Sequence, residues 1–405
     1  MSEWKTYKLG DVATVQTGPF GSQLHQADYV NDGTPIITVE HLGENRILHS
    51  NLPRVTDEDR IRLRKYWLQE GDIVFSRVGS VDRRAYVKDL EDGWLFSGRC
   101  LRVRPINEFT DGKYLSYFFG LEEFKTRIRA VAVGATMPSL NTSIMSNIEV
   151  RLPNIETQKE IAQILSSLDD KIELNLQMNQ TLEAMAQAIF KEWFVNFNFP
   201  GFDGELVDGL PKGWNRCLIK DFGKIVCGKT PSKAVKEYFG GEYMFIKIPD
   251  MHNSVFIIET TDSLTEEGLN SQSNKTIPPF SICVSSIATV GLVCINPEPC
   301  QTNQQINSIV PKNKDSRYFL YFLTTSMKDT FLATASGGTA TLNMNTSQFS
   351  NIGAFMPGED ILKEFDVIVS PIMEKILENE YNIKSLTQTR DTLLPKLMSG
   401  QLEVV

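Results

Sequence analysis

The sequence predicts two similar mixed α/β (α+β) domains, each followed by a long helix that belongs to a coiled-coil spacer. Three observations lead to this prediction: a segment repeats within the chain, short strands and helices alternate inside each copy, and each copy ends in a long amphipathic stretch. The period of the repeat far exceeds the roughly 20–50 residues of a solenoid unit, so each copy is a globular domain. A chain of 405 residues has room for two.

The repeat is visible near both ends of each domain. The start Trp4-Lys-Thr-Tyr-Lys-Leu-Gly-Asp11 returns as Trp214-Asn-Arg-Cys-Leu-Ile-Lys-Asp221. The later segment Gly134-Ala-Thr-Met-Pro-Ser-Leu-Asn-Thr-Ser-Ile-Met-Ser-Asn-Ile148 returns as Gly338-Thr-Ala-Thr-Leu-Asn-Met-Asn-Thr-Ser-Gln-Phe-Ser-Asn-Ile352, at an offset of 204 residues. One chain therefore carries two similar but unequal surfaces, which is what reading a two-part asymmetric target requires.

The repeat divides the chain into five segments. The two domains cover residues 1–154 and 214–357, and the two helices cover residues 155–196 and 358–400. The remaining segment, residues 197–213, is rich in Gly, Pro and Asp and is expected to be a linker.

Short β-branched and aromatic runs occupy matching places in the two copies and predict strands. They are Pro35–Val39 and Asp72–Ser76 in the first copy, and Tyr243–Ile248 and Ser281–Ser285 in the second. Matching short helices are expected at residues 114–119 and 318–323.

Each long helix has an apolar stripe at a spacing of three and four residues, which predicts a helix seam. Thr157 and Glu160 form a capping-box pattern after Pro153, and Pro371 should kink or break the second helix. The alternative is a surface helix that packs only on its own domain. Each stripe is too long for that, so we expect the helices to pack on each other through Ile161, Leu165, Leu168, Ile172, Leu182, Ile189 and Trp193, and Phe365, Val369, Ile372, Ile376, Ile383, Leu386, Leu393 and Leu397. Asn175 and Asn379 interrupt the stripes at equivalent positions, as polar residues that fix register do.

The net charge of −9 is concentrated on the helical segments, since residues 155–200 and 358–405 carry −4 each. The two domains are close to neutral and can still present a basic face, although nucleic-acid-binding domains usually are more basic. The six cysteines have no C-x-x-C spacing, so free thiols in a reducing cytoplasm are expected. No apolar run is long enough for a membrane span, and no secretory signal is visible.

No catalytic motif is found in the chain. Phosphate-loop and dinucleotide-binding patterns are absent, and the four histidines lack metal-ligand spacing. Pro278-Pro279-Phe280 is a poor match to the N-P-P-F loop of adenine methyltransferases, because Ile277 stands where a polar residue is needed. Gly18-Pro-Phe-Gly21 is interpreted as a tight turn rather than an anion loop, since no phosphate-binding helix follows it.

Polar loops at matching places are the remaining candidates for binding. In the first domain Arg77, Arg83 and Arg84 follow a predicted strand, and arginine suits guanine edges and phosphates equally. Surface salt bridges are the alternative role for these arginines. The loops at 134–141 and 338–345 are small and hydroxyl-rich, and either approach a ligand or are strand-turn segments. The other first-domain candidates are Ser22, Gln23, His41, Ser80, Thr136, Ser139 and Asn141.

The second domain carries different side chains at the matching loops. Ser286 and Thr289 stand where the first domain has its arginines, and a basic loop at residues 229–233 replaces Pro19–Gln23. Two different half-sites would follow from this divergence. The second-domain candidates are Lys229, Thr230, Ser232, Lys233, His252, Ser286, Thr289, Thr339, Thr341 and Asn343.

The chain resembles the specificity (S) subunits of Type I restriction-modification systems over nearly its whole length. The residues that carry the resemblance are Trp4 and Trp214, Gly71–Ser76, Leu140-Asn-Thr and Met344-Asn-Thr, Gln187-Ala-Ile-Phe-Lys-Glu-Trp-Phe-Val195, and Leu393-Leu-Pro-Lys-Leu-Met-Ser-Gly-Gln-Leu402. The last two, together with the repeat, are the most specific.

The resemblance implies two target-recognition domains separated by two antiparallel helices. Each domain would read one half of a bipartite, asymmetric double-stranded DNA sequence, and the helices would set the gap and dock two methyltransferase subunits. Those partners would methylate adenine at N6 with S-adenosylmethionine, and motor-nuclease subunits would cut with ATP and Mg²⁺. This chain would catalyse nothing and bind no cofactor. A non-catalytic coiled-coil scaffold with two protein-binding domains is the alternative, and a self-sufficient methyltransferase is nearly excluded by the missing motifs.

Overall fold

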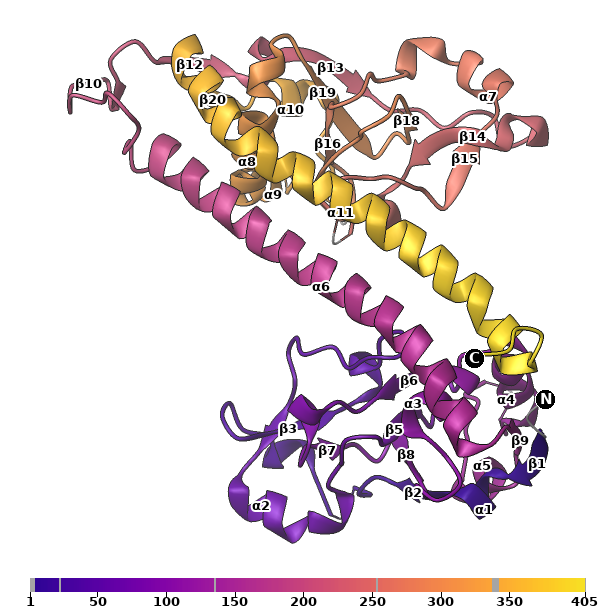
Figure 1. Cartoon of the computed structure of the whole chain (residues 1–405). Coiled ribbons are helices and arrows are strands. Elements are labelled where there is room, and N and C mark those ends of the chain that lie inside the picture. Colours follow the sequence, from indigo (N-terminus) through magenta and orange to yellow (C-terminus); the bar gives the residue numbers. More distant parts are fainter. Residues whose placement is uncertain (1–3, 22, 135, 253, 337–341, 405) are drawn as a thin grey trace. The chain divides into compact units, whose positions relative to one another are not determined.

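The computed structural model describes residues 4–404 except 22, 135, 253 and 337–341 (Figure 1). The chain forms two compact units. The first contains residues 1–171 and 386–405, and the second contains residues 172–385. Each unit therefore consists of one mixed α/β domain together with parts of two long helices, which agrees with the predicted fold class.

The first domain is built on a four-stranded antiparallel sheet in the order β2-β8-β5-β6. Its strands are β2 (Ala13–Thr17), β8 (Cys100–Pro105), β5 (Ile73–Ser76) and β6 (Arg84–Tyr86). A second sheet has the order β4-β3-β7, from β4 (Arg54–Val55), β3 (Thr34–Ile37) and β7 (Leu95–Phe96), with β3 and β7 parallel. The pair β1 (Lys5–Lys8) and β9 (Glu149–Leu152) joins the two ends of the domain.

Short helices cover these sheets. They are α1 (Leu9–Val12), α2 (Asp57–Arg62), α3 (Gly112–Phe118), α4 (Glu122–Val131) and α5 (Thr142–Ser146). β5 is buried on both faces, so its apolar residues divide between two cores: Ile73 and Phe75 pack toward α3 and α4, while Val74 packs toward β3 and β7.

The second domain repeats this order of strands. Its four-stranded sheet is β13-β19-β16-β17, from β13 (Gly223–Cys227), β19 (Ile306–Pro311), β16 (Ile282–Ser285) and β17 (Val293–Ile295). Its three-stranded sheet is β15-β14-β18, from β15 (Asp262–Leu264), β14 (Phe239–Ile246) and β18 (Gln301–Thr302). β12 (Asn215–Leu218) pairs with β20 (Gly353–Met356), as β1 does with β9. The linker contains a short hairpin of β10 (Leu206–Val207) and β11 (Leu210–Pro211).

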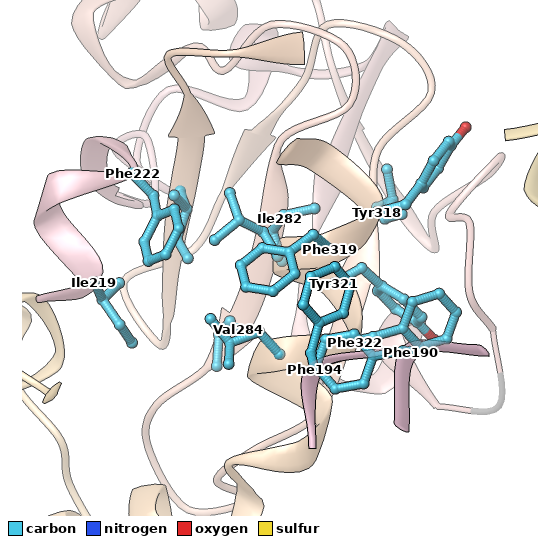
Figure 2. Close-up of a cluster of buried hydrophobic side chains, with 14 of the residues drawn as sticks. Phe190, Phe194, Ile219, Phe222, Ile282, Val284, Tyr318, Phe319, Tyr321 and Phe322 are labelled. Atoms are coloured by element: carbon cyan, nitrogen blue, oxygen red, sulfur yellow. The ribbon is translucent and has the colours of Figure 1, made fainter. Parts of the chain in front are cut away.

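An aromatic core joins the second domain to the long helix that precedes it (Figure 2). The short helices of the second domain are α7 (Glu266–Asn270), α8 (Arg317–Ser326), α9 (Lys328–Ala335) and α10 (Thr346–Ser350). Phe194 of the long helix meets Phe319 of α8 edge to face, with ring centroids 4.7 Å apart. Phe190 meets Phe322 at 5.9 Å. Buried aromatic pairs contribute beyond the area that they remove from water, so this end of the helix is held firmly on its domain.

The long helices are α6 (Ile155–Phe194) and α11 (Glu359–Ser399). Two details differ from the sequence predictions. α6 begins before Thr157, because the Asn154 side chain caps it by accepting the Thr157 N–H at 2.8 Å. α11 runs through Pro371 without a break: Pro371 is exposed, and Val367, whose carbonyl loses its helical donor, is itself 67% exposed and can be hydrated.

Within each unit the two long helices pack side by side in opposite directions. In the second unit Asn179 contacts Asn379, whereas Trp193, later in α6, contacts Phe365, earlier in α11. All residues predicted for the seam are buried or half-buried. The polar pair at the seam joins Asn379 to Asn179, however, and not to Asn175, which is only half-buried.

Among the described residues, no helix is long and apolar enough to span a membrane.

Candidate nucleic-acid interface

Three loops of the first domain meet where its sheets end, and backbone hydrogen bonds hold them together. The Arg77 N–H, just after β5, donates to the Arg99 carbonyl at 2.8 Å. The Leu140 N–H donates to the Arg77 carbonyl at 2.9 Å. The loop after β2 joins them, because the Gly18 N–H donates to the Cys100 carbonyl at 3.2 Å.

The second domain repeats each of these bonds at the equivalent positions. The Ser286 N–H donates to the Gln305 carbonyl at 2.7 Å, and the Met344 N–H donates to the Ser286 carbonyl at 2.8 Å. The Gly228 N–H donates to the Ile306 carbonyl at 3.1 Å. The convergence of loops is therefore a property of the duplicated backbone and does not depend on the side chains, which differ between the copies.

Glycine is required where these loops touch. A Cβ on Gly18 would lie 2.2 Å from the Ser97 carbonyl oxygen, and a Cβ on Gly228 would lie 2.2 Å from the Asn303 carbonyl oxygen. Real Cβ atoms do not approach that closely, so any other residue would force the loops apart. The same close approach in both copies fixes how the turns at residues 97–99 and 303–305 are presented.

The predicted arginines of the first domain are largely committed to internal contacts. Arg77 donates to the Gly98 carbonyl at 3.0 Å and lies over the ring of Phe20 at 5.2 Å. Arg83 donates to the Leu42 carbonyl.

Arg84 is buried, so the side chain predicted as a DNA contact is enclosed by its own domain. It donates to the Ser116 carbonyl at 2.6 Å and pairs with Glu44 at 3.0 Å. Burial lowers the pKa of Arg84 from its ordinary value, opposed by Glu44. Burial alone would raise the pKa of Glu44, but Arg84 and Lys125 lower it below its ordinary value.

Other first-domain candidates are divided between the surface and the interior. His41 is buried and its Nδ1 accepts the Thr38 N–H at 3.1 Å, and Gln23 accepts a hydrogen bond from Tyr66 at 2.6 Å. Asn141 caps α5 by accepting the Ile144 N–H at 2.8 Å, and Ser139 is half-buried beside Val133. Ser80 and Thr136 are exposed, and Ser22 lies outside the described residues.

The second-domain candidates include a basic, exposed loop. Lys229, Ser232 and Lys233 are exposed, as are His252, Thr289 and Asn343. Ser286 is buried and accepts the Asn307 side-chain N–H at 2.9 Å, so it serves the interior. Thr339 and Thr341 lie outside the described residues.

The basic loop borders a cavity of about 580 Å³ on the second domain. Its lining is mixed: polar side chains come from Thr230, Lys233, Lys247, Asp262, Asn303, Gln304 and Gln305, and apolar ones from Pro231, Phe239 and Phe245. Thr230 Oγ1 and Gln304 Oε1 lie 2.7 Å apart, which ties the loop to the turn between β18 and β19. The site therefore offers cations and amides together, the groups that bind phosphates and base edges.

Comparison with known proteins decides what this arrangement is. The family described as "Type I restriction modification DNA specificity domain" matches residues 1–184 and 211–379. The Type I restriction enzyme HindI specificity subunit of Haemophilus influenzae is 36% identical, with 99% of this chain and 100% of that protein covered. The chain belongs to the Type I specificity-domain family.

Two further comparisons agree with this membership. The Type I restriction enzyme MjaIX specificity subunit of Methanocaldococcus jannaschii is 28% identical over 72% of this chain and 69% of its own length. The crystal structure of a Type I restriction-modification S subunit from M. genitalium has the same fold, with a TM-score of 0.63 at 15% identity, covering 98% of this chain and 96% of that one. DNA target recognition is thus the function of the specificity domains, and the alternative of a protein-binding scaffold is not favoured.

The sequence interpretation missed the turn between β7 and β8 and its equivalent between β18 and β19. Arg99 and Gln304 are exposed there, beside the loops that had been chosen. β7 and β18 have only two residues each, too short for an alternating pattern to reveal. An alignment of the two specificity domains at Cys100 and Ile306 would have revealed these turns, because the backbone pattern repeats there while the polar residues differ.

Proposed function

We propose that the chain reads a bipartite, asymmetric sequence in double-stranded DNA, with one half-site for each specificity domain. The observation that carries this proposal is the duplicated loop frame: the same backbone hydrogen bonds hold converging loops in both domains, while the exposed side chains on those loops differ. A repeated frame with different polar groups suits two related but unequal half-sites.

The chain supplies recognition, and associated subunits supply the chemistry. Two methyltransferase subunits that carry S-adenosylmethionine would dock on the helices and methylate adenine at N6, and motor-nuclease subunits would cut unmethylated DNA with ATP and Mg²⁺. Apolar side chains left exposed on the helices support a docking role, since Leu174, Met185 and Val367 are 56%, 50% and 67% exposed. The acidic charge of the helical segments keeps DNA away from the spacer.

The experiment is to express this chain with the methyltransferase subunit of its own system in a host that lacks adenine methylation, and to map N6-methyladenine by long-read sequencing. One split asymmetric motif that appears only when this chain is present is the expected result. A methyltransferase that is active with the same motif in the absence of this chain would overturn the proposal.

The role of the helices as a spacer has its own test. Four residues, close to one turn at 3.6 residues per turn, are inserted on the same side of the Asn179–Asn379 contact in both α6 and α11. The gap between the half-sites should widen while both half-sites stay the same. An unchanged gap in an active complex would show that the helices do not set the spacing.

A further inference from the structure

The turns at residues 97–99 and 303–305 occupy the same place in the two domains. The last residue of each turn accepts a backbone hydrogen bond from the residue that follows the central strand: Arg99 from Arg77, and Gln305 from Ser286. Gly18 and Gly228 press against these turns from the neighbouring loop. The turns are therefore rigid through their backbones, and each has one exposed polar side chain, Arg99 in the first domain and Gln304 in the second.

In the first domain the turn presents one guanidinium. Arg99 is exposed, and among residues 4–404 as the structure describes them no hydrogen bond or ion pair involves its side chain. Arg77, Arg83 and Arg84, in contrast, donate to carbonyls of the domain. An unpaired guanidinium on a rigid turn keeps its planar fork of donors available, and that fork matches the O6 and N7 acceptors of guanine.

In the second domain the turn presents an exposed amide from the position before the equivalent of Arg99, which is Gln305. Gln304 is exposed, and its Oε1 accepts a hydrogen bond from the Thr230 hydroxyl at 2.7 Å. That bond orients the carboxamide, because Oε1 faces Thr230 and the Nε2 donors and the second lone pair of Oε1 point elsewhere. A carboxamide that donates through nitrogen and accepts through oxygen matches N7 and the N6 amino group of adenine.

The surroundings of Gln304 fit DNA. Gln304 lines the cavity of 580 Å³ that Lys233 and Lys247 share. Lys247 is paired with Asp262 at 2.5 Å, whereas Lys233 is exposed on the adjoining loop. A cation at the rim of this cavity suits a phosphate beside a base edge, since phosphate contacts position a protein and base contacts specify the sequence.

We propose that Arg99 reads a guanine in the half-site of the first domain and that Gln304 reads an adenine in the half-site of the second. This assignment rests on the proposed function, because it names the base contacts of the same two domains. Arg99→Gln should then convert the guanine requirement to adenine, and Gln304→Glu should convert the adenine requirement to cytosine, whose N4 amino group a carboxylate accepts.

The test uses the whole complex, with this chain and its methyltransferase expressed together and the methylated motif mapped for each variant. Arg99→Ala should relax one guanine position in one half-site, with discrimination at that position reduced roughly 5- to 150-fold. The other half-site should stay unchanged. Gln304→Ala should do the same at one adenine of the opposite half-site. Each variant is thus the control for the other domain.

Arg127→Ala is the matched arginine control. Arg127 is also exposed and in the first domain, but it lies on α4 and pairs with Glu123. It should leave the motif unchanged. Unfolding temperatures are measured for all variants, and they should match the parent because the turns are held by backbone bonds.

If a variant methylates too weakly for mapping, the purified complex is tested by competition with duplexes in which each base of the parent motif is changed in turn. A loss confined to one guanine for Arg99, or one adenine for Gln304, supports the assignment. Uniform weakening at all positions means a phosphate contact and overturns it. A parent complex with a split motif that neither substitution alters also overturns it, while leaving the proposed function intact. A parent complex whose methylation does not depend on this chain contradicts the proposed function itself.

Discussion

Asn379 donates a hydrogen bond from Nδ2 to Oδ1 of Asn179 at 2.8 Å, inside the seam between the two long helices. Asn179 in turn donates from its own Nδ2 to Glu380 at 2.9 Å. Asn379 Oδ1 is buried and has no hydrogen-bond partner among the residues that the structure describes. The polar contact is therefore a poor source of stability, and its value lies in fixing which residues of the helices face each other.

The two asparagines should be energetically coupled. Asn379→Leu leaves the Asn179 carbonyl oxygen without its donor in an apolar seam, which costs about 1–3 kcal/mol. The double variant Asn179→Leu, Asn379→Leu should lose less than the sum of the two single variants, with a coupling of about 0.5–3 kcal/mol. Urea unfolding of the four proteins measures the cycle, and strict additivity would show that the contact is not formed in solution.

Glu380 should make stability depend on pH. Burial raises the pKa of Glu380 above its ordinary value, partly opposed by the hydrogen bond from Asn179. The folded protein then binds more protons than the unfolded chain, so Glu380 lowers stability as pH rises from the ordinary pKa of glutamate, about 4.3, through the raised value. Glu380→Gln should be more stable than the parent at neutral pH and equal to it near the bottom of that window.

Thermal unfolding over this pH range measures the Glu380 effect. Glu378→Gln is the control, since Glu378 is exposed on the same helix and pairs with Lys375. A Glu378 variant that gained as much as the Glu380 variant would mean that net charge, and not burial, is responsible.

Asp169 of α6 holds the first domain to the helices of its unit. It accepts from the Tyr117 hydroxyl at 2.5 Å and from Arg390 Nη1 at 2.7 Å. Tyr117→Phe removes a hydrogen bond to a charged group and should cost about 1.5–3 kcal/mol. Arg390→Met leaves the Asp169 carboxylate without its cation and should cost at least as much, but less than the roughly 3–5 kcal/mol of a fully buried pair, because Asp169 is 24% exposed.

Chemical denaturation measures both substitutions at Asp169. Arg127→Met breaks an exposed pair with Glu123 and should change stability by about 1 kcal/mol or less. Equal costs at Arg390 and Arg127 would contradict the structural role given to Asp169.

The cysteines should differ sharply in reactivity. Cys100, Cys283, Cys294 and Cys300 are buried, and burial raises the pKa of Cys100 to about 12. Cys227 and Cys217 are half-buried, and burial with Asp221 raises the pKa of Cys217 to about 11. Iodoacetamide near neutral pH should label Cys227 first and Cys217 slowly, since the thiolate is the nucleophile. The other four should be labelled only after unfolding, and mass spectrometry gives the order.

The internal repeat made much of the fold predictable. Because the same pattern occurs twice, the strands near residues 73 and 282 and the helices near residues 114 and 318 could each be recognised with a second copy as support. Period and apolar spacing also revealed the long helices. These features depend on local patterns that both copies keep.

Contacts across the helices could not be read from the repeat. Asn175 and Asn379 are equivalent by the 204-residue offset, but equivalence in the repeat does not by itself make two residues contact partners when the helices run in opposite directions. The contact partner of Asn379 is one turn further along α6, at Asn179. The predicted break at Pro371 was wrong for another reason. A proline interrupts a helix less when the carbonyl that loses its donor faces water, and Val367, which carries that carbonyl, is exposed.

The direction of loop side chains was also beyond the sequence. Arg84 occupies the first position of β6, and all three residues of this short strand are buried, so no alternation marks where the strand begins. The adjacent residues Arg83 and Arg84 therefore have different environments, and Arg84 lies in the interior, where it pairs with Glu44. Arg99, in a turn with no pattern of its own, remains outside.

The backbone bonding of the turns after β7 and β18 separates folding from the choice of side chain. Since neither Arg99 nor Gln304 supports the domain core, substitutions at these two positions should change the free energy of unfolding little. A library in which either position is randomised should therefore contain mostly folded members that still assemble with their partner subunits. If the proposed base contacts hold, one or two codon changes would give the chain a new target sequence without rebuilding the protein around it.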